Sequence, residues 1–145
     1  MSSLKTIIRL QKWKLDEKRR ALAELQNLAD RLQAEIERLK EEIAAERDTA
    51  RGNVEYAFTY SNYIQAAMER GKRLTQSMGQ VEAQIAVATD EMAEAFQELK
   101  RYELAEEERL KREKEKLKRK EATMLDETAL VGFRRRQREE SELET

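Results

Sequence analysis

An apolar stripe from Leu22 to Ile43 constrains the fold of this chain more than any other feature. Its residues follow one another in alternating steps of three and four, with charged and amide residues between them: Leu22, Leu25, Ala29, Leu32, Ile36, Leu39 and Ile43. This spacing keeps one narrow stripe on one side of a helix, which is the a/d pattern of a coiled coil. Such a helix needs a partner helix.

The composition favours long helices over a globular core. Charged residues make up 41% of the 145 residues and the mean hydropathy is −0.92, whereas average proteins are roughly 25% charged. The chain contains no proline and only four glycines, so few residues interrupt a helix. We therefore expect an all-α fold.

Two apolar stripes, here called the first and second seams, predict how the chain folds. The first seam extends the stripe in both directions and includes Ile8, Leu15, Leu22, Leu25, Leu32, Ile36, Leu39 and Ile43. The second runs from Ile64 to Tyr102 and includes Leu74, Met78, Val81, Ile85, Met92 and Leu99. Small and flexible residues are frequent in the second seam, which suits interlocking with the larger residues of the first. The predicted fold is a long antiparallel two-helix coiled-coil hairpin. The alternative, a structural scaffold or spacer, predicts a parallel dimer or a higher oligomer instead of a monomeric hairpin.

We expect one elongated domain over residues 1–145, with a helix at 4–51, a reversal at 52–61, a helix at 62–133 and a frayed tail at 134–145. Gly52-Asn53 breaks the first seam, and Ser61 or Asn62 is the candidate N-cap of the second helix. The reversal region is rich in aromatic residues: Tyr56, Phe58, Tyr60 and Tyr63. These side chains are expected either to close the end of the hairpin by packing on one another or to form a docking tip.

A highly charged segment follows the second seam. Between Lys100 and Glu121, 17 of 22 residues are charged, and residues 109–120 contain eight basic and two acidic residues, a net charge of +6. Residues after about 108 have no counterpart in the first helix, so the C-terminal helix is expected to project past the N-terminus. Its basic face is interpreted either as a solvated surface or as a contact for an acidic partner.

The composition argues against an enzyme and against a nucleic-acid binder. The chain has no His and no Cys, so the commonest general base and the commonest metal ligands are missing; we expect no cofactor. The net charge of −1 differs from the strongly basic domains that bind nucleic acid. The N-terminal residues resemble neither a signal peptide nor a membrane span, so a cytoplasmic protein is expected.

Trp13 is the most unusual single residue. Helical spacing places Ile7, Leu10 and Trp13 progressively away from the first seam, with Trp13 nearly opposite to it. The second helix therefore cannot cover Trp13. Either the C-terminal tail folds over this residue, or it lies exposed and belongs to a partner-binding surface, where Trp is enriched.

Three segments resemble the FliJ family of flagellar export proteins, especially its α-proteobacterial members. They are LKTIIRLQKWKLDEKRRALAEL at residues 4–25, YAFTYSNYIQAAMERGKRL at 56–74 and EAFQELKRYE at 94–103. The resemblance implies a non-enzymatic, soluble component of the flagellar type III export apparatus that is held at the cytoplasmic face of the inner membrane through its partners. The implied partners are the export ATPase (FliI-like), its regulator (FliH-like), the export gate (FlhA-like) and export chaperones. The equivalent stalk protein of a virulence type III secretion system is similar in shape, and this identification is kept as an alternative.

The resemblance also implies a stalk protein that inserts into a ring. The terminal end of the hairpin is therefore expected to enter the ring of the export ATPase. The expected ring contacts are Ile7, Leu10, Trp13, Arg112, Arg119, Leu125 and Phe133. The aromatic turn, with Tyr56, Phe58, Tyr60 and Tyr63, is expected to face the gate or a chaperone.

Overall fold

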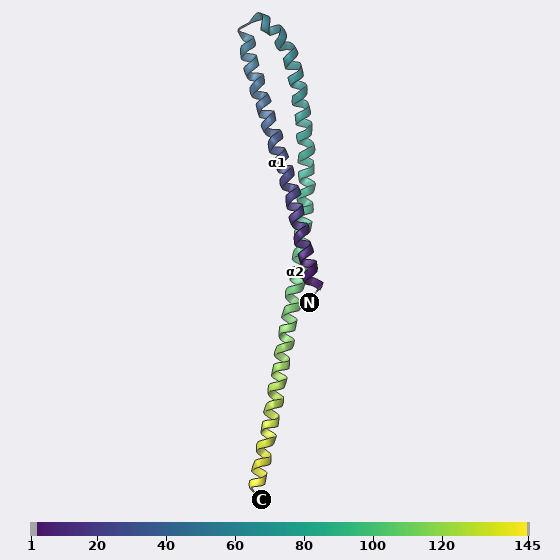
Figure 1. The fold of residues 1–145 in the computed structure, drawn as a ribbon, viewed down its shortest axis with the longest axis vertical. Coiled ribbons are helices and arrows are strands. Elements are labelled where there is room, and N and C mark those ends of the chain that lie inside the picture. The colour runs from purple at the N-terminus through teal and green to yellow at the C-terminus, as the bar shows by residue number, and fades with distance from the viewer. Residues whose placement is uncertain (1–2, 145) are drawn as a thin grey trace. The chain divides into compact units, whose positions relative to one another are not determined.

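The computed structural model describes residues 3–144, which form two helices (Figure 1). The first, α1, spans Ser3–Arg51, and the second, α2, spans Val54–Leu143. Residues 3–144 contain no strand, so the predicted all-α fold is confirmed. The chain divides into two compact units: a hairpin unit, Ile8–Leu99, and a terminal unit made of Met1–Ile7 with Lys100–Thr145.

In the hairpin unit, α1 and α2 run side by side in opposite directions (Figure 1). Their mostly buried residues are Leu15, Leu22, Leu39, Ala67, Val81, Ala88 and Leu99, and every residue assigned to the two seams is buried or half-buried. The spacing of three and four explains this result, because it keeps each seam turned toward the other helix along the whole unit. The predicted helical hairpin is confirmed.

The reversal between the helices is much shorter than the predicted segment 52–61. α1 ends at Arg51, and the amides of Gly52 and Asn53 donate to the carbonyls of Thr49 and Ala50, at 3.3 and 3.4 Å. The side-chain oxygen of Asn53 accepts a hydrogen bond from the amide of Glu55, at 3.1 Å. This is the N-cap contact that satisfies a free amide at the start of a helix.

The cap is therefore Asn53, and the predicted caps Ser61 and Asn62 lie inside α2. The four aromatic residues of the expected loop lie in the first turns of α2. The concentration of aromatic residues suggested an irregular turn, but Asn53 alone supplies the start signal for the helix.

In the terminal unit, the first residues of α1 lie with the part of α2 that begins at Lys100. Leu4 and Ile7 are half-buried, and Glu106 of α2 is mostly buried. From Leu110 to Glu144, every residue except Gly132 is exposed. Within this unit α2 thus projects past the start of α1, as predicted.

The tail from residue 134 is helical through Leu143 rather than frayed, and residue 145 lies outside the described residues. Its residues explain the difference, because Arg, Gln, Glu and Leu are all good helix formers and no proline interrupts them.

Gly71 offers a test of how closely the two helices pack. A Cβ added at Gly71 would lie 3.5 Å from a terminal methyl carbon of Leu39, an ordinary van der Waals contact, whereas one added at Gly79 would meet nothing within 4 Å. We expect Gly71→Ala and Gly79→Ala each to raise the free energy of unfolding by up to about 1 kcal/mol, because alanine is the better helix former. Thermal unfolding followed by circular dichroism measures both effects. A loss of stability in Gly71→Ala, with a gain in Gly79→Ala, would show that the helices pack more tightly there.

Candidate functional site

The residues expected to contact a ring fall in both units. Leu10 and Trp13 belong to the hairpin unit, whereas Ile7 and residues 112–133 belong to the terminal unit. In the hairpin unit, Trp13 is 60% exposed and Leu10 is 48% exposed. The seam of α1 faces α2, so these two side chains point away from the helix that could have covered them. Within the hairpin unit, α2 thus leaves Trp13 uncovered.

The terminal unit exposes an apolar segment, residues 124–133. Its large apolar side chains are all more than half exposed: Met124, Leu125, Leu130, Val131 and Phe133. Successive residues of a helix turn by about 100°, so Met124 and Val131 share one side, while Leu125 and Phe133 lie on the other. A helix that is apolar on more than one side is typical of buried helices. This segment is therefore suited to a partner that surrounds it.

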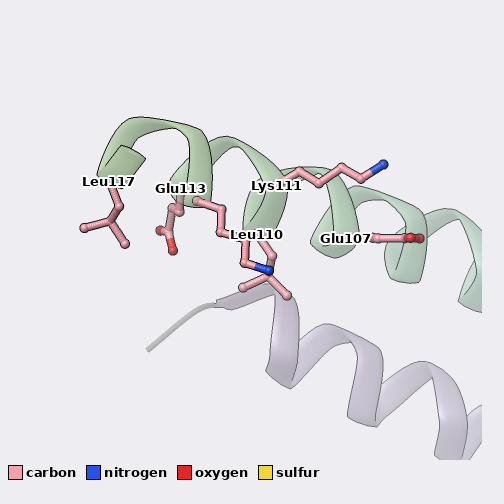
Figure 2. Close-up of a pocket in the computed structure, with 6 residues that line it drawn as sticks. Glu107, Leu110, Lys111, Glu113 and Leu117 are labelled. Carbon is pink, nitrogen blue, oxygen red and sulfur yellow. The ribbon is translucent and has the colours of Figure 1, made fainter. Parts of the chain in front are cut away.

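Between this apolar segment and Glu106, α2 presents a charged face with widely spaced apolar residues. Leu110 and Leu117 are one heptad apart and at least half exposed. Figure 2 shows their open surroundings, where Leu110 points in the direction of the start of α1 and Leu117 lies farther along α2. Arg112 and Arg119 are exposed on the same stretch. This stretch thus combines the exposed leucines Leu110 and Leu117 with a strongly basic surface.

An ion pair that the sequence analysis missed lies at the start of this stretch. Glu106 as a whole residue is only 8% exposed, and its carboxylate accepts two hydrogen bonds from the Arg109 guanidinium, at 2.8 and 3.0 Å. Arg109 also donates to Glu113 at 2.7 Å. The hydrogen bonding of Arg109 to Glu106 is the main cause that raises the pKa of Arg109. Glu106 and Arg109 continue the three-four spacing of Leu99 and Tyr102, and this spacing was the signal that could have identified them.

At the turn end, the aromatic residues divide into two groups. Tyr56, Tyr60 and Tyr63 are half-buried, and the rings of Tyr60 and Tyr63 lie 6.5 Å apart at a tilt of 35°. Phe58 is 84% exposed, and Val54, one turn before it, is also almost fully exposed. The tyrosines thus help to close the end of the hairpin, whereas Val54 and Phe58 are available to a partner. Sequence reasoning missed Val54 because the helix was expected to begin later.

Tyr63 links the two helices near the turn. Its hydroxyl donates to the carboxylate of Glu42 at 3.5 Å. Burial raises the pKa of Tyr63, as do the negative charges of Glu42 and Glu46, while the positive charge of Arg70 lowers it.

This shift predicts a loss of stability at alkaline pH. An unfolded tyrosine ionises near pH ~10, and the folded chain holds the Tyr63 proton to higher pH. The stabilisation is fully present below pH ~10 and is lost as the pH rises through the folded pKa. We expect Tyr63→Phe to flatten this alkaline decrease, and Glu42→Gln to lower the pKa of Tyr63 in a spectrophotometric titration. An unchanged titration in Glu42→Gln would contradict the contact.

Comparison with models of protein families identifies the family to which this chain belongs. The family model described as flagellar FliJ protein matches residues 1–138. The chain belongs to the FliJ family. Membership indicates a component of the flagellar export apparatus. Comparisons with curated proteins and with solved structures each give no match.

The described part of this FliJ-family chain contains no helix that is long and apolar enough to cross a membrane. Residues 3–144 also contain no group of three or more acidic residues placed to hold a metal ion. Three groups of exposed apolar side chains lie on the described residues: the pair Leu10 and Trp13, the apolar segment 124–133 and the pair Val54 and Phe58.

Proposed function

We propose that this FliJ-family chain binds and regulates the export ATPase ring and links it to the export gate and to export chaperones. The observation that supports this proposal most directly is the apolar segment 124–133, whose large side chains are exposed on more than one side of α2. The inside of a protein ring can surround a single helix in this way.

The energetics favour enclosure of this segment. Fully burying a Leu, Met, Val or Phe side chain contributes roughly 1.5–3 kcal/mol, and the segment has five such side chains that are more than half exposed. Their burial contributes on the order of 5 kcal/mol before the entropy cost of association. Arg112 and Arg119 precede the segment and are exposed; in this proposal they meet acidic groups at the mouth of the ring.

The turn end supplies a second contact. Val54 and Phe58 form an exposed apolar pair one helical turn apart, on the opposite end of α2 from the segment 124–133. We assign this pair to the export gate or to a chaperone. The regulator of the ATPase is reached through the ring, and the chain is held at the cytoplasmic face of the inner membrane through these partners.

In this role the chain does no chemistry itself. It has neither His nor Cys, and its effect is exerted on the catalytic rate of the ATPase through assembly of the ring.

The contribution of Leu10 and Trp13 is tested with the purified chain and the export ATPase. The wild-type chain is expected to raise the ATPase rate, and the double substitution Leu10→Ala with Trp13→Ala to lose most of this stimulation. Both residues are exposed, so the helicity of the variant is expected to be unchanged. Met68→Ala is the matched control, because Met68 is 63% exposed but lies nearer the turn. Full stimulation of the ATPase by the double variant would show that Leu10 and Trp13 do not contact the ATPase.

A further inference from the structure

In the terminal unit, the side of α2 that packs on the start of α1 continues past it as an exposed leucine pair, Leu110 and Leu117. Leu4 and Ile7 of α1 are half-buried in this unit, and Glu106 of α2 is mostly buried. Leu110 follows Glu106 by four residues and Leu117 follows Leu110 by seven, so all three lie on one side of the helix. Leu110 is 50% exposed and Leu117 is 60% exposed. Figure 2 shows Leu110 pointing in the direction of the start of α1, with Leu117 farther along α2.

Basic residues flank the leucine pair on both sides. The positions directly before and after the two leucines are all basic: Arg109, Lys111, Lys116 and Lys118. Neighbouring residues of a helix are turned by about 100° from one another, so these side chains lie along the two edges of the leucine pair. The three lysines are exposed.

The acidic residues near the leucine pair do not cancel these charges. Glu106 and Glu113 both accept hydrogen bonds from Arg109, so they share one of the four flanking groups. Glu107 lines the space beside the leucines, but Lys114 lines it too. The flanking lysines therefore keep their charge, and residues 109–120 have a net charge of +6.

We propose that the leucine pair and its flanking basic residues bind an acidic amphipathic helix of a partner protein. Steps of four and seven residues are the spacing at which one helix packs along another, and the start of α1 already packs on this side of α2 near Glu106. The partner helix packs on the same side beyond the first residues of α1. Its acidic residues, beside its own apolar stripe, face the flanking lysines, as complementary charges do in paired helices.

A second copy of this chain suits the site less well. Pairing of two copies through the leucines would bring together two segments that each have a net charge of +6, and these segments repel one another. An acidic helix meets no such repulsion.

The site is separate from the ATPase contacts of the proposed function. Arg112 and Arg119 each follow a leucine of the pair by two residues, which is about 200° around the helix. They therefore lie on the opposite side of α2 from the leucine pair, and the two contacts can be tested independently.

The test is the binding of a fluorescent synthetic helix to the full chain, measured by fluorescence anisotropy with no ATPase present. The probe has three heptads, with leucine at the two seam positions and glutamate at the two flanking positions of each heptad. A second probe keeps the glutamates and has glutamine in place of leucine, and a third keeps the leucines and has lysine in place of glutamate. The first probe is expected to bind about tenfold or more tightly than either of the others.

Leu110→Gln with Leu117→Gln is expected to lower the affinity for the first probe by about tenfold or more, because it removes both apolar contacts and no charge. Both leucines are at least half exposed, so the helicity of the variant, measured by circular dichroism, is expected to be unchanged.

A pair of charge reversals tests the side of the helix. Lys111→Glu with Lys118→Glu is expected to weaken binding of the first probe by about tenfold or more, because like charges then face one another. Arg112→Glu with Arg119→Glu is the matched control, since it makes the same change of charge one residue farther along the chain. Its charges lie on the opposite side of α2 and are largely screened at physiological salt, so its affinity is expected to stay within about threefold of the wild type.

Several results would overturn the proposal. No binding of the first probe, or unchanged binding by the leucine or the lysine variant, would remove the site. Equal binding of the glutamine probe would show a surface for any polyanion, and equal binding of the lysine probe would show an apolar surface without charge selection. A mass above 17.1 kDa for the free chain in sedimentation equilibrium, lost in Leu110→Gln with Leu117→Gln, would assign the pair to a second copy. None of these results depends on ATPase binding, so the proposed function is tested separately.

Discussion

Leu39→Ala is expected to lower the free energy of unfolding of the hairpin by about 2–4 kcal/mol. Leu39 is only 6% exposed and lies against Gly71, so no large side chain of α2 at that level can move in to fill the space. Leu39→Asp is expected to be more damaging, because it also places a charge between the helices. Chemical denaturation followed by circular dichroism measures both losses.

Leu28→Ala is the matched control for this substitution. It removes the same side-chain atoms from α1 at a position that is 37% exposed, so its expected loss is a fraction of that of Leu39→Ala. Equal losses at the two positions would contradict the packing of α1 on α2.

The double substitution Leu125→Glu with Phe133→Glu is expected to abolish binding to the export ATPase while leaving the hairpin intact. Leu125 is 70% exposed and Phe133 is 56% exposed, so neither substitution disturbs packing within the chain. Each is expected to reduce affinity by about 2 kcal/mol or more, roughly thirtyfold, as residues at the centre of an interface do. The dissociation constant of the purified pair and the ATPase rate report the effect.

Gln65→Glu with Gln137→Glu is the charge-matched control for this prediction. It adds the same two negative charges at exposed positions outside the apolar segment and is expected to bind normally. Normal binding by Leu125→Glu with Phe133→Glu would instead place the ATPase contact elsewhere on the chain.

The hairpin could be predicted from the sequence because one signal repeats over its whole length. The spacing of three and four identified both seams, and residues as different as Leu15 and Gly71 are buried or half-buried where that spacing puts them. The continuation at Glu106 and Arg109 was missed because these residues are charged. A buried carboxylate is tolerated there since Arg109 supplies two hydrogen bonds to it.

Helix limits were harder to predict than helix pairing. The reversal was placed among the aromatic residues, but a single contact from Asn53 to the amide of Glu55 starts α2 eight residues earlier than predicted. The tail was expected to fray on position alone, whereas its residues are good helix formers.

The exposure of some candidate site residues could be predicted from the sequence, but the partner that each exposed residue contacts could not. The helical position of Trp13 already placed it away from the seam, and it is exposed. Leu125 and Phe133 were identified as single residues, whereas the apolar character of all of 124–133 became clear only from the exposure of its five large side chains. Which end of the hairpin meets which partner depends on groups that belong to the partner.

Photo-crosslinking in flagellated cells tests the central claim most directly. A photoreactive residue replaces Leu125 in one variant and Ala44, an exposed residue of α1 near the turn, in another. The account predicts an adduct with the export ATPase from position 125 and none from position 44. An ATPase adduct from position 44 alone, or none from position 125 in cells that assemble flagella, would contradict it.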